Sequence, residues 1–172
     1  VNINLSPRQF EDINLGQKIL ATLQRYQLQP RHLKLEITES LLIVTNEKVM
    51  NILEELNQAG IQICLDDFGT GYSALSYLHQ FPIDVIKIDS SFTKKMRARD
   101  KNYEIIRAII ALGQALEMEV VTEGVETHLQ LQLLRSLQCE LLQGFLISPP
   151  LPAPELEKRI DQWVWASLPL GA

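Results

Sequence analysis

Two adjacent carboxylates, Asp66 and Asp67, are the first feature of this sequence that could do chemistry. They follow an apolar strand-like run at 61–65 and precede the glycine-rich segment 68–71. Successive residues of a strand point to opposite faces, so both carboxylates can serve one site only where the chain bends. Gly69 and Gly71 permit such a bend. An isolated Asp-Asp pair is also typical of a strand end followed by a tight turn.

The pair is not isolated, because other strand-like runs also become polar at or near one end. The polar residues are Asn4, Glu36, Lys87, Asp89 and Glu123, with Glu126 shortly after Glu123 and Gln143 near the start of the last run. In a (β/α) barrel the carboxyl ends of the strands surround one mouth, where the chemistry is placed. We therefore expect the acidic residues to gather at that mouth, with Lys87 nearby.

A group of carboxylates at one mouth repels itself unless protons or cations neutralise it. Carboxylate oxygens, together with the amide oxygen of Asn4, are the hard ligands that suit Mg²⁺ or Mn²⁺. An aspartate shared by two cations is the usual bridge of a two-metal site, which activates water and stabilises phosphoryl oxygens during in-line displacement. The residues therefore predict metal-assisted hydrolysis of a phosphodiester, provided that the barrel is formed.

The elements that must position these residues alternate along the chain. Strands are predicted at 1–5, 33–38, 61–66, 85–88, 119–122 and 141–147, and helices at 17–28, 47–59, 103–116, 128–137 and 154–167. Alternating strands and helices predict a parallel sheet with right-handed crossovers. A doubly wound open sheet and a TIM-like barrel both fit this order of elements.

Two observations favour the barrel. No G-x-G-x-x-G turn follows the first strand, as a dinucleotide-binding sheet would require, and the polar residues sit at strand ends. A closed barrel needs eight strands and about six are visible, so we expect an incomplete TIM-like α/β barrel. The chain opens on an alternating strand without a start methionine, which predicts that it is part of a longer domain.

Composition narrows the classes of function. The 172 residues carry 46% hydrophobic and 22% charged side chains with a formal net charge of −5, which is typical of a globular domain and argues against binding to a DNA or RNA duplex. Cys64 and Cys139 are too few for a disulfide scaffold and fit a reducing compartment. No apolar run reaches the roughly 18 residues of a membrane span, so we expect no membrane contact from this segment.

The motifs closely resemble those of the EAL domain family, the bacterial phosphodiesterases that hydrolyse cyclic di-GMP. The similar segments follow the family's order at 4–6 (Asn-x-Ser), 35–40 (Leu-Glu-Ile-Thr-Glu-Ser), 66–73, 86–89, 123–127 and 143–145. One Asp-Asp-Phe-Gly-Thr-Gly segment can arise by chance, whereas six motifs in order are a specific signal.

The resemblance implies two ions of Mg²⁺ or Mn²⁺ in the intact domain. It assigns Asn4, Glu36 and Asp66 to one ion, and Asp66 and Asp67 to the other, with Glu123 close to both. These assignments agree with the clustering of carboxylates expected from the strand ends, but the division of labour comes from the resemblance.

The resemblance also implies roles for the remaining polar residues. Lys87 would hold and polarise the attacking water, which makes it a catalytic residue together with Glu123 and Asp67. Gln143 would place water or substrate, and Glu126 would support the site. Glu39 would anchor the glycine loop that carries Asp67 and that often reaches a dimer partner.

One departure from the family matters. The signature Glu-Ala-Leu strand, whose Glu is a metal ligand, has no counterpart in these 172 residues. In the family it precedes the Asn-x-Ser strand, so residues 1–172 correspond to the C-terminal two-thirds of the domain, a partial EAL domain. One ligand and two strands are then missing, and unpaired strand edges remain. We expect this segment by itself to be impaired.

The expected activity of the domain is therefore the hydrolysis of cyclic di-GMP to linear pGpG in bacterial second-messenger signalling. The alternatives are a catalytically inactive cyclic di-GMP receptor and a protein-interaction module. The resemblance further implies a homodimer, an upstream sensor or GGDEF domain, and a location in the bacterial cytoplasm with any membrane tether lying upstream.

Overall fold

Six strands form one parallel sheet in the computed structural model, which describes residues 1–44, 47–71 and 78–162. The strands are β1 (Asn2–Asn4), β2 (Lys34–Thr38), β3 (Gln62–Phe68), β4 (Val85–Ile88), β5 (Glu119–Thr122) and β6 (Leu141–Leu142), and they pair in sequence order. A doubly wound sheet reverses its order at a switch point, whereas a barrel keeps consecutive strands adjacent. The order confirms the α/β prediction and excludes the doubly wound alternative.

Helices connect the strands. The connections contain η1 (Pro7–Glu11), α1 (Leu15–Arg25) and η2 (Pro30–His32) after β1, α2 (Glu39–Val44) and α3 (Glu47–Gln58) after β2, α5 (Ser90–Lys95) and α6 (Lys101–Ala115) after β4, α7 (His128–Ser136) after β5, and α8 (Ala153–Gln162) after β6. Four predicted helices are confirmed with small shifts at their ends. The prediction at 154–167 is confirmed as far as 162, and the rest of it lies outside the described residues. Among the described helices, none combines the length and the apolarity needed to cross a bilayer.

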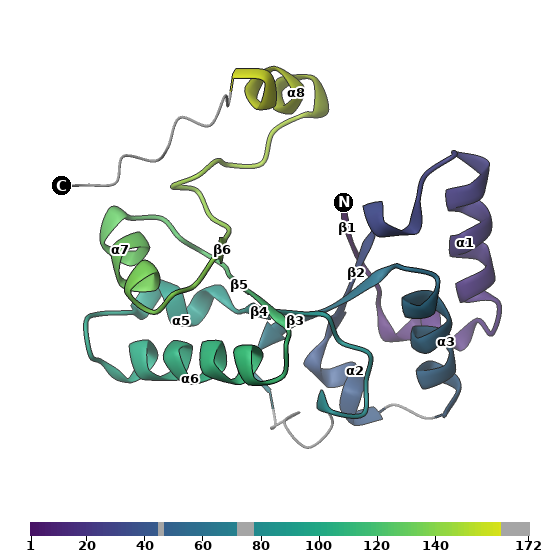
Figure 1. Cartoon of the computed structure of the whole chain (residues 1–172), viewed down its shortest axis with the longest axis horizontal. Coiled ribbons are helices and arrows are strands. Elements are labelled where there is room, and N and C mark those ends of the chain that lie inside the picture. The colour runs from purple at the N-terminus through teal and green to yellow at the C-terminus, as the bar shows by residue number, and fades with distance from the viewer. Residues whose placement is uncertain (45–46, 72–77, 163–172) are drawn as a thin grey trace.

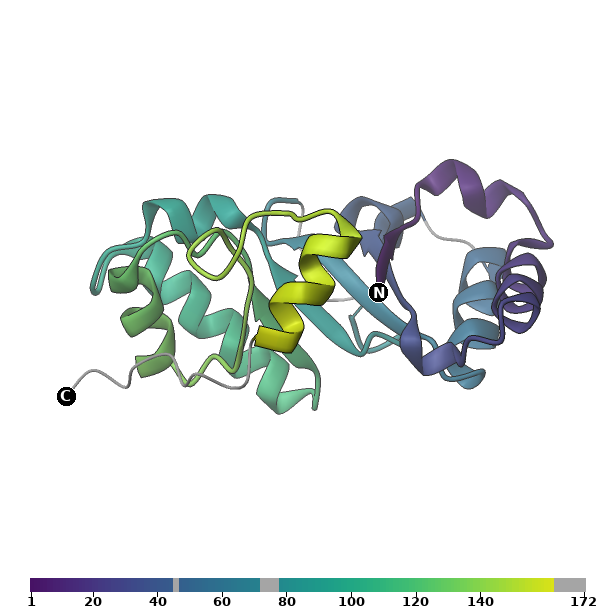
Figure 2. The ribbon, with the colours of Figure 1, turned by 90° about the horizontal axis from the view of Figure 1, so that it is seen from above.

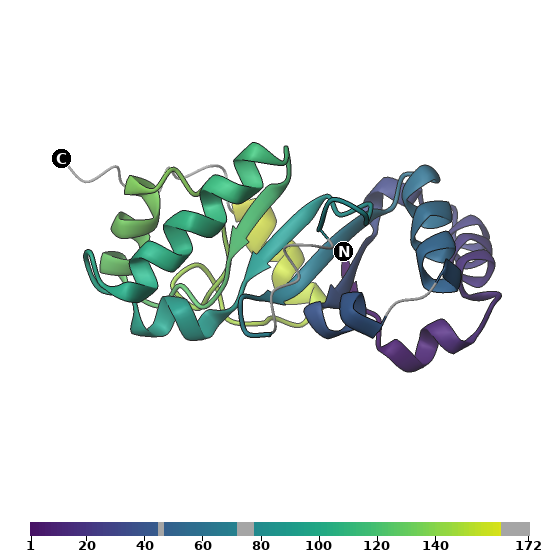
Figure 3. The same cartoon turned by 90° about the horizontal axis from the view of Figure 1, so that it is seen from below.

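The core lies between the outer face of the sheet and the helices that cover it. Six side chains of this face are almost completely shielded from solvent: Leu35, Ile37, Ile63, Leu65, Ile86 and Ile88. Burial of each such side chain stabilises the fold by about 1.5–3 kcal/mol. Helix α6 packs below β4 and β5 and α3 lies beside β3, whereas α8 lies on the opposite side of the sheet from α6 (Figure 1, Figure 2, Figure 3).

The sheet curls as a barrel wall does. The Lys34 ammonium on β2 forms an ion pair with the Glu119 carboxylate on β5 at 2.9 Å. Strands β3 and β4 lie between them, so a flat sheet would separate the two backbones by about 14 Å. Contact between these side chains therefore requires curvature toward the inner face.

The last predicted strand is corrected by the structure. Pairing stops at Leu142, and residues 143–147 turn away instead of continuing the strand predicted at 141–147. The N–H groups of Ile147 and Ser148 bond back to the Gly144 carbonyl at 3.0 and 3.1 Å. Gly144 lies directly against Val125, where an added Cβ would come within 2.2 Å of the Val125 carbonyl oxygen. This close packing draws the chain toward the loop after β5.

Candidate functional site

Three carboxylates from different strands converge on the ammonium of Lys87. Its Nζ lies 2.9 Å from Glu36 Oε1, 3.0 Å from Asp66 Oδ1 and 2.5 Å from Glu123 Oε1. Glu36 and Lys87 are buried, and the side chains of Asp66 and Glu123 keep exposed fractions of 14% and 18%. We call Glu36, Asp66, Asp67 and Glu123 the carboxylate cluster.

Strand register explains this convergence. Thr38 of β2 pairs with Asp66 of β3, and Glu36 pairs with Cys64, so the two acidic residues lie on the same face and two positions apart. Lys87 pairs with Val121 of β5, and Glu123 follows β5 with its N–H bonded to the Ile88 carbonyl at 3.1 Å. The inward face of four consecutive strands thus supplies the group, as the polar strand ends predicted.

A β-bulge places Asp67 beside Asp66. Leu65 pairs with Ile86 and Phe68 with Ile88, so two aspartates of β3 stand opposite the single residue Lys87. Asp67 has a φ of 55°, in the left-handed region that residues other than glycine rarely adopt. The chain therefore bends at Asp67 itself. Gly69, which was expected to permit a bend, also has a positive φ of 95°, so the chain turns at Asp67 and again two residues later.

The glycine-rich segment after the bulge is bonded to Glu39, the first residue of α2. Glu39 Oε2 accepts hydrogen bonds from the N–H groups of Gly69 and Gly71 at 3.3 and 3.2 Å. The Thr70 hydroxyl donates to the Asp67 carbonyl at 2.8 Å. Glu39 is buried, and its carboxylate connects the loop after β3 to the start of α2, directly after β2. Residues 72 and 73 of the predicted motif lie outside the described residues.

The electrostatics of the group are dominated by an excess of negative charge. Burial alone would lower the pKa of Lys87, but hydrogen bonds to Glu123, Glu36 and Asp66 outweigh it and raise that pKa above its ordinary value. Burial raises the pKa of Glu123, and the charges of Asp66 and Glu36 add to this effect against Lys87. Burial and the adjacent Asp66 carboxylate likewise raise the pKa of Asp67. One ammonium does not offset four carboxylates.

The loop that carries Glu123 is held by α5 and α7. Gly124 has a φ of 70°, and an added Cβ would lie 2.6 Å from the Cβ of Ser90, the first residue of α5. The buried amide of Gln130 accepts from the N–H groups of Glu126 and Thr127 at 2.8 Å each and donates to the Thr93 carbonyl at 3.1 Å. These contacts fix the loop between its neighbours, so Glu123 has a rigid support.

Three predicted residues lie outside the contacts around Lys87. Asn4 and Gln143 are exposed at the ends of β1 and β6, and Gln143 follows its strand rather than standing near its start. Glu126 is also exposed, and among the described residues its carboxylate has no ion-pair partner.

Asn2 was not among the predicted site residues. Its Nδ2 donates to Glu36 Oε1 at 2.8 Å, so Asn2 and not Asn4 supplies the amide that contacts the carboxylate cluster. The signal was available, because alternate residues of a strand share a face and Asn2 lies two positions before Asn4.

The oxygen ligands of the carboxylate cluster are of the chemical type that binds a hard divalent cation. Four carboxylates with excess negative charge, and raised pKa values at Asp67 and Glu123, mark a place where added positive charge is stabilising. Over residues 1–44, 47–71 and 78–162, however, no three acidic, His or Cys side chains are already arranged as a metal cage. The carboxylates surround the Lys87 ammonium instead.

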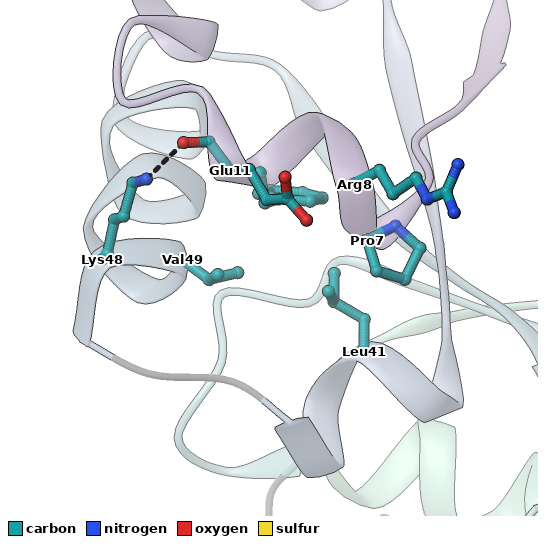
Figure 4. A pocket seen from close by; sticks show the side chains of 7 residues that line it. Pro7, Arg8, Glu11, Leu41, Lys48 and Val49 are labelled. Atoms are coloured by element: carbon teal, nitrogen blue, oxygen red, sulfur yellow. Dashed lines mark hydrogen bonds between the residues drawn. The ribbon is translucent and has the colours of Figure 1, made fainter.

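A separate cavity of about 380 Å³ lies between η1, α2 and α3 (Figure 4). Phe10, Leu41 and Val49 give it apolar walls, and Lys48 crosses one side to bond the Glu11 carbonyl at 2.5 Å. It shares no residue with the carboxylate cluster, so it is not the place where the predicted chemistry would occur.

Comparison with known proteins supplies independent information. The model of the EAL domain family matches residues 1–150. MucR of Pseudomonas aeruginosa, a bifunctional diguanylate cyclase/cyclic di-GMP phosphodiesterase, is 42% identical over 156 residues, which cover 91% of this chain and 23% of MucR. The chain spans about a fifth of the length of the curated relatives that it matches.

Solved structures show the same fold. The EAL domain of Mycobacterium smegmatis DcpA is 35% identical with a TM-score of 0.89, over 94% of this chain and 72% of that one. The PaMucR phosphodiesterase in complex with cyclic di-GMP gives 42% identity and a TM-score of 0.84, over 90% and 63%. Klebsiella pneumoniae BlrP1, solved with cyclic di-GMP and calcium or manganese, gives 32% identity and TM-scores of 0.78 and 0.79, over 84% and 37%.

Proposed function

Since this chain belongs to the EAL domain family, we propose that residues 1–172 are part of an EAL domain that binds cyclic di-GMP and hydrolyses it to linear pGpG. The observation that carries this proposal is the convergence of Glu36, Asp66 and Glu123 on Lys87 at the carboxyl ends of the strands. Relatives named as cyclic di-GMP phosphodiesterases support the choice of substrate.

The reaction opens the ring at one phosphodiester. Water adds to phosphorus, the bond from phosphorus to one 3′ oxygen breaks, and a proton from the water ends on the released 3′-hydroxyl. Lys87, protonated and held by three carboxylates, acts as a hydrogen-bond donor that orients and polarises the attacking water. Glu123, whose Oε1 lies 2.5 Å from the Lys87 ammonium, accepts this proton from the water and passes it to the released 3′ oxygen.

Asn4, Glu36, Asp66, Asp67 and Glu123 would hold two divalent ions, with Asp66 shared between them. When bound, Mg²⁺ or Mn²⁺ would supply Lewis-acid stabilisation of the phosphoryl oxygens and lower the pKa of a water. The calcium and manganese complexes of BlrP1 support a divalent cation for this family, and the donor chemistry of the present cluster supports it for this chain.

The remaining polar residues have supporting roles in this proposal. Gln143 and Glu126, which are both exposed, would place substrate or water. Glu39 holds the loop that follows Asp67 through the N–H groups of Gly69 and Gly71, and so fixes the bulge. The same loop is our candidate for contact with a second copy in a homodimer.

The wider setting is also part of the proposal. An upstream sensor or GGDEF domain agrees with the length of MucR, which is about four times that of this chain. Two buried free thiols agree with a reducing cytoplasm.

A second function, a cyclic di-GMP receptor without hydrolysis, is favoured by one observation. Among the described residues, the carboxylates surround the Lys87 ammonium and form no ready three-ligand metal cage. For the same reason we propose that these residues by themselves hydrolyse cyclic di-GMP more slowly than a complete domain.

Titration of cyclic di-GMP with and without Mn²⁺, while binding and product are both measured, separates these functions. Hydrolysis that needs Mn²⁺ and is abolished by Asp66→Asn supports the phosphodiesterase, and metal-independent binding without product supports the receptor. Failure to bind cyclic di-GMP under either condition, or unchanged metal dependence in Asp66→Asn, refutes the site.

A further inference from the structure

The amide of Asn2 is bonded to the one carboxylate that comes from β2. Asn2 Nδ2 donates to Glu36 Oε1 at 2.8 Å, and Lys87 Nζ lies 2.9 Å from the same oxygen. Asn2 belongs to β1, so the contact crosses from one strand to the next on the inward face. Two donors from two different strands thus fix a single oxygen.

A glutamate carboxylate needs such contacts to keep one orientation. Rotation about its last torsion is broad, because no staggered well confines an sp² group. Two donors on Oε1 set the plane of the Glu36 carboxylate. Over the described residues, no hydrogen bond to Oε2 is found, so this oxygen remains available to another partner.

The register separates the roles of the two asparagines in β1. Asn4 pairs with Glu36 and lies nearer the mouth, whereas Asn2 pairs with Lys34, one pleat further from it. Asn2 therefore reaches Glu36 from a strand position further from the mouth than that of Asn4. Because the Asn2 amide binds Glu36 from this position, it does not occupy the side of the Glu36 carboxylate that is nearer the mouth.

We propose that Asn2 is a positioning residue, which orients Glu36 so that Oε2 faces a divalent cation at the mouth. The inference rests on the proposed function, in which Glu36 is a metal ligand. Partners of metal ligands commonly change metal affinity by about 10–100-fold when they are removed. Because Asn2 is exposed at an edge strand, we expect the lower end of this range.

Mn²⁺ titration into the metal-free 172-residue chain, followed by calorimetry or by the resonance of free Mn²⁺, tests the proposal. Asn2→Leu removes the donor at similar volume, Asn2→Gln keeps an amide, and Asn51→Leu is a matched control at an exposed position of α3. Glu36→Gln reports on the metal site itself. Thermal unfolding without metal is recorded for every variant.

The expected result is an approximately tenfold weaker Mn²⁺ affinity for Asn2→Leu, with partial recovery in Asn2→Gln and no change in Asn51→Leu. The melting temperature of Asn2→Leu without metal should stay within about 2 °C of the parent chain. Wild-type affinity in Asn2→Leu, combined with a loss in Glu36→Gln, overturns the role of Asn2 and leaves the metal site standing. Equal affinity of the parent chain and Glu36→Gln overturns the metal site, and the role of Asn2 with it. A large drop in melting temperature that Asn2→Gln does not recover assigns Asn2 a purely structural role and also overturns the proposal.

Discussion

Replacement of Lys87 by methionine is the sharpest test of the electrostatic argument. Met keeps most of the apolar stem but removes the ammonium that three carboxylates share at 2.5–3.0 Å. The carboxylates of Glu36, Asp66 and Glu123 then face one another in a largely buried position. Repulsion and lost hydrogen bonds should lower the free energy of unfolding.

The size of this effect follows from burial. Loss of one partner from a buried ion pair costs about 3–5 kcal/mol. Asp66 and Glu123 keep some exposure, so we expect about 3 kcal/mol at pH 7.5 without divalent cations. For a chain of this length the melting temperature should fall by roughly 6–12 °C.

Lys34→Met is the matched control, because it also removes a lysine from the inward face. Lys34 has a single partner, Glu119, and their side chains are 28% and 49% exposed. Exposed pairs contribute about 0–1 kcal/mol, so the control should cost no more than this. Chemical denaturation in EDTA gives both values directly.

The difference in stability between Lys87→Met and the parent chain should depend on pH. The pKa of Lys87 is raised in the folded chain, so its stabilising effect is complete at every pH below the ordinary lysine value and is lost only as pH rises through the higher folded value. In Lys87→Met the unneutralised carboxylates acquire raised pKa values, and protonation on acidification relieves their repulsion. The gap between the variant and the parent chain should therefore shrink between pH 7.5 and pH 5. Equal costs for Lys87→Met and Lys34→Met, or a gap that does not change with pH, would refute the reasoning.

Three further predictions concern the supports of the site and the thiols. Gly124→Ala should destabilise the chain by about 1–3 kcal/mol in denaturant titration, because its φ is positive and the new Cβ meets Ser90 at the start of α5, whereas Gly16→Ala in α1 meets only the end of a flexible side chain and should cost far less. Gln130→Leu should cost about 2–3 kcal/mol by the same measurement, because it leaves the buried Thr93 carbonyl and two partly buried N–H groups without their partner, and a cost below 0.5 kcal/mol would contradict this. Burial raises the pKa of Cys64 to about 12 and also raises that of Cys139, so iodoacetamide at pH 8 should label neither thiol until the chain is unfolded, and rapid labelling of the folded chain would show that the thiols are accessible.

Much of the fold could be predicted because its signals are local. The helix at 47–59 repeats apolar residues on one face, and the structure has α3 at Glu47–Gln58. Strand β4 was predicted with its observed bounds, because Val85–Ile88 is a short apolar run between turns. The prediction failed at 141–147, where a backbone contact between Gly144 and Val125 ends the strand. The residue types at 143–147 do not indicate a contact with Val125, which lies about twenty positions earlier in the chain.

The candidate site also has features that the sequence predicted and features that it did not. Polar residues at strand ends predicted that Glu36, Asp66 and Glu123 would meet, since parallel strands in barrel order bring those ends to one mouth. Lys87 was expected nearby, but its ion pairs with all three carboxylates could not be predicted, because they depend on the register of four strands. The same holds for Asn2, whose contact with Glu36 depends on the register of β1 against β2.

The sequence by itself determined which residues alternate between core and inner face, and therefore which side chains are available to the mouth. Only the tertiary structure decided how these side chains are used: that Asp67 bends the chain and turns beside Asp66, that one ammonium joins three strands, and that β6 is short. The physical reason is the range of the interactions. Periodicity and turn propensity act over a few residues, whereas a bulge, a shared ion pair and a close backbone contact form only after strands far apart in the chain have been brought into register.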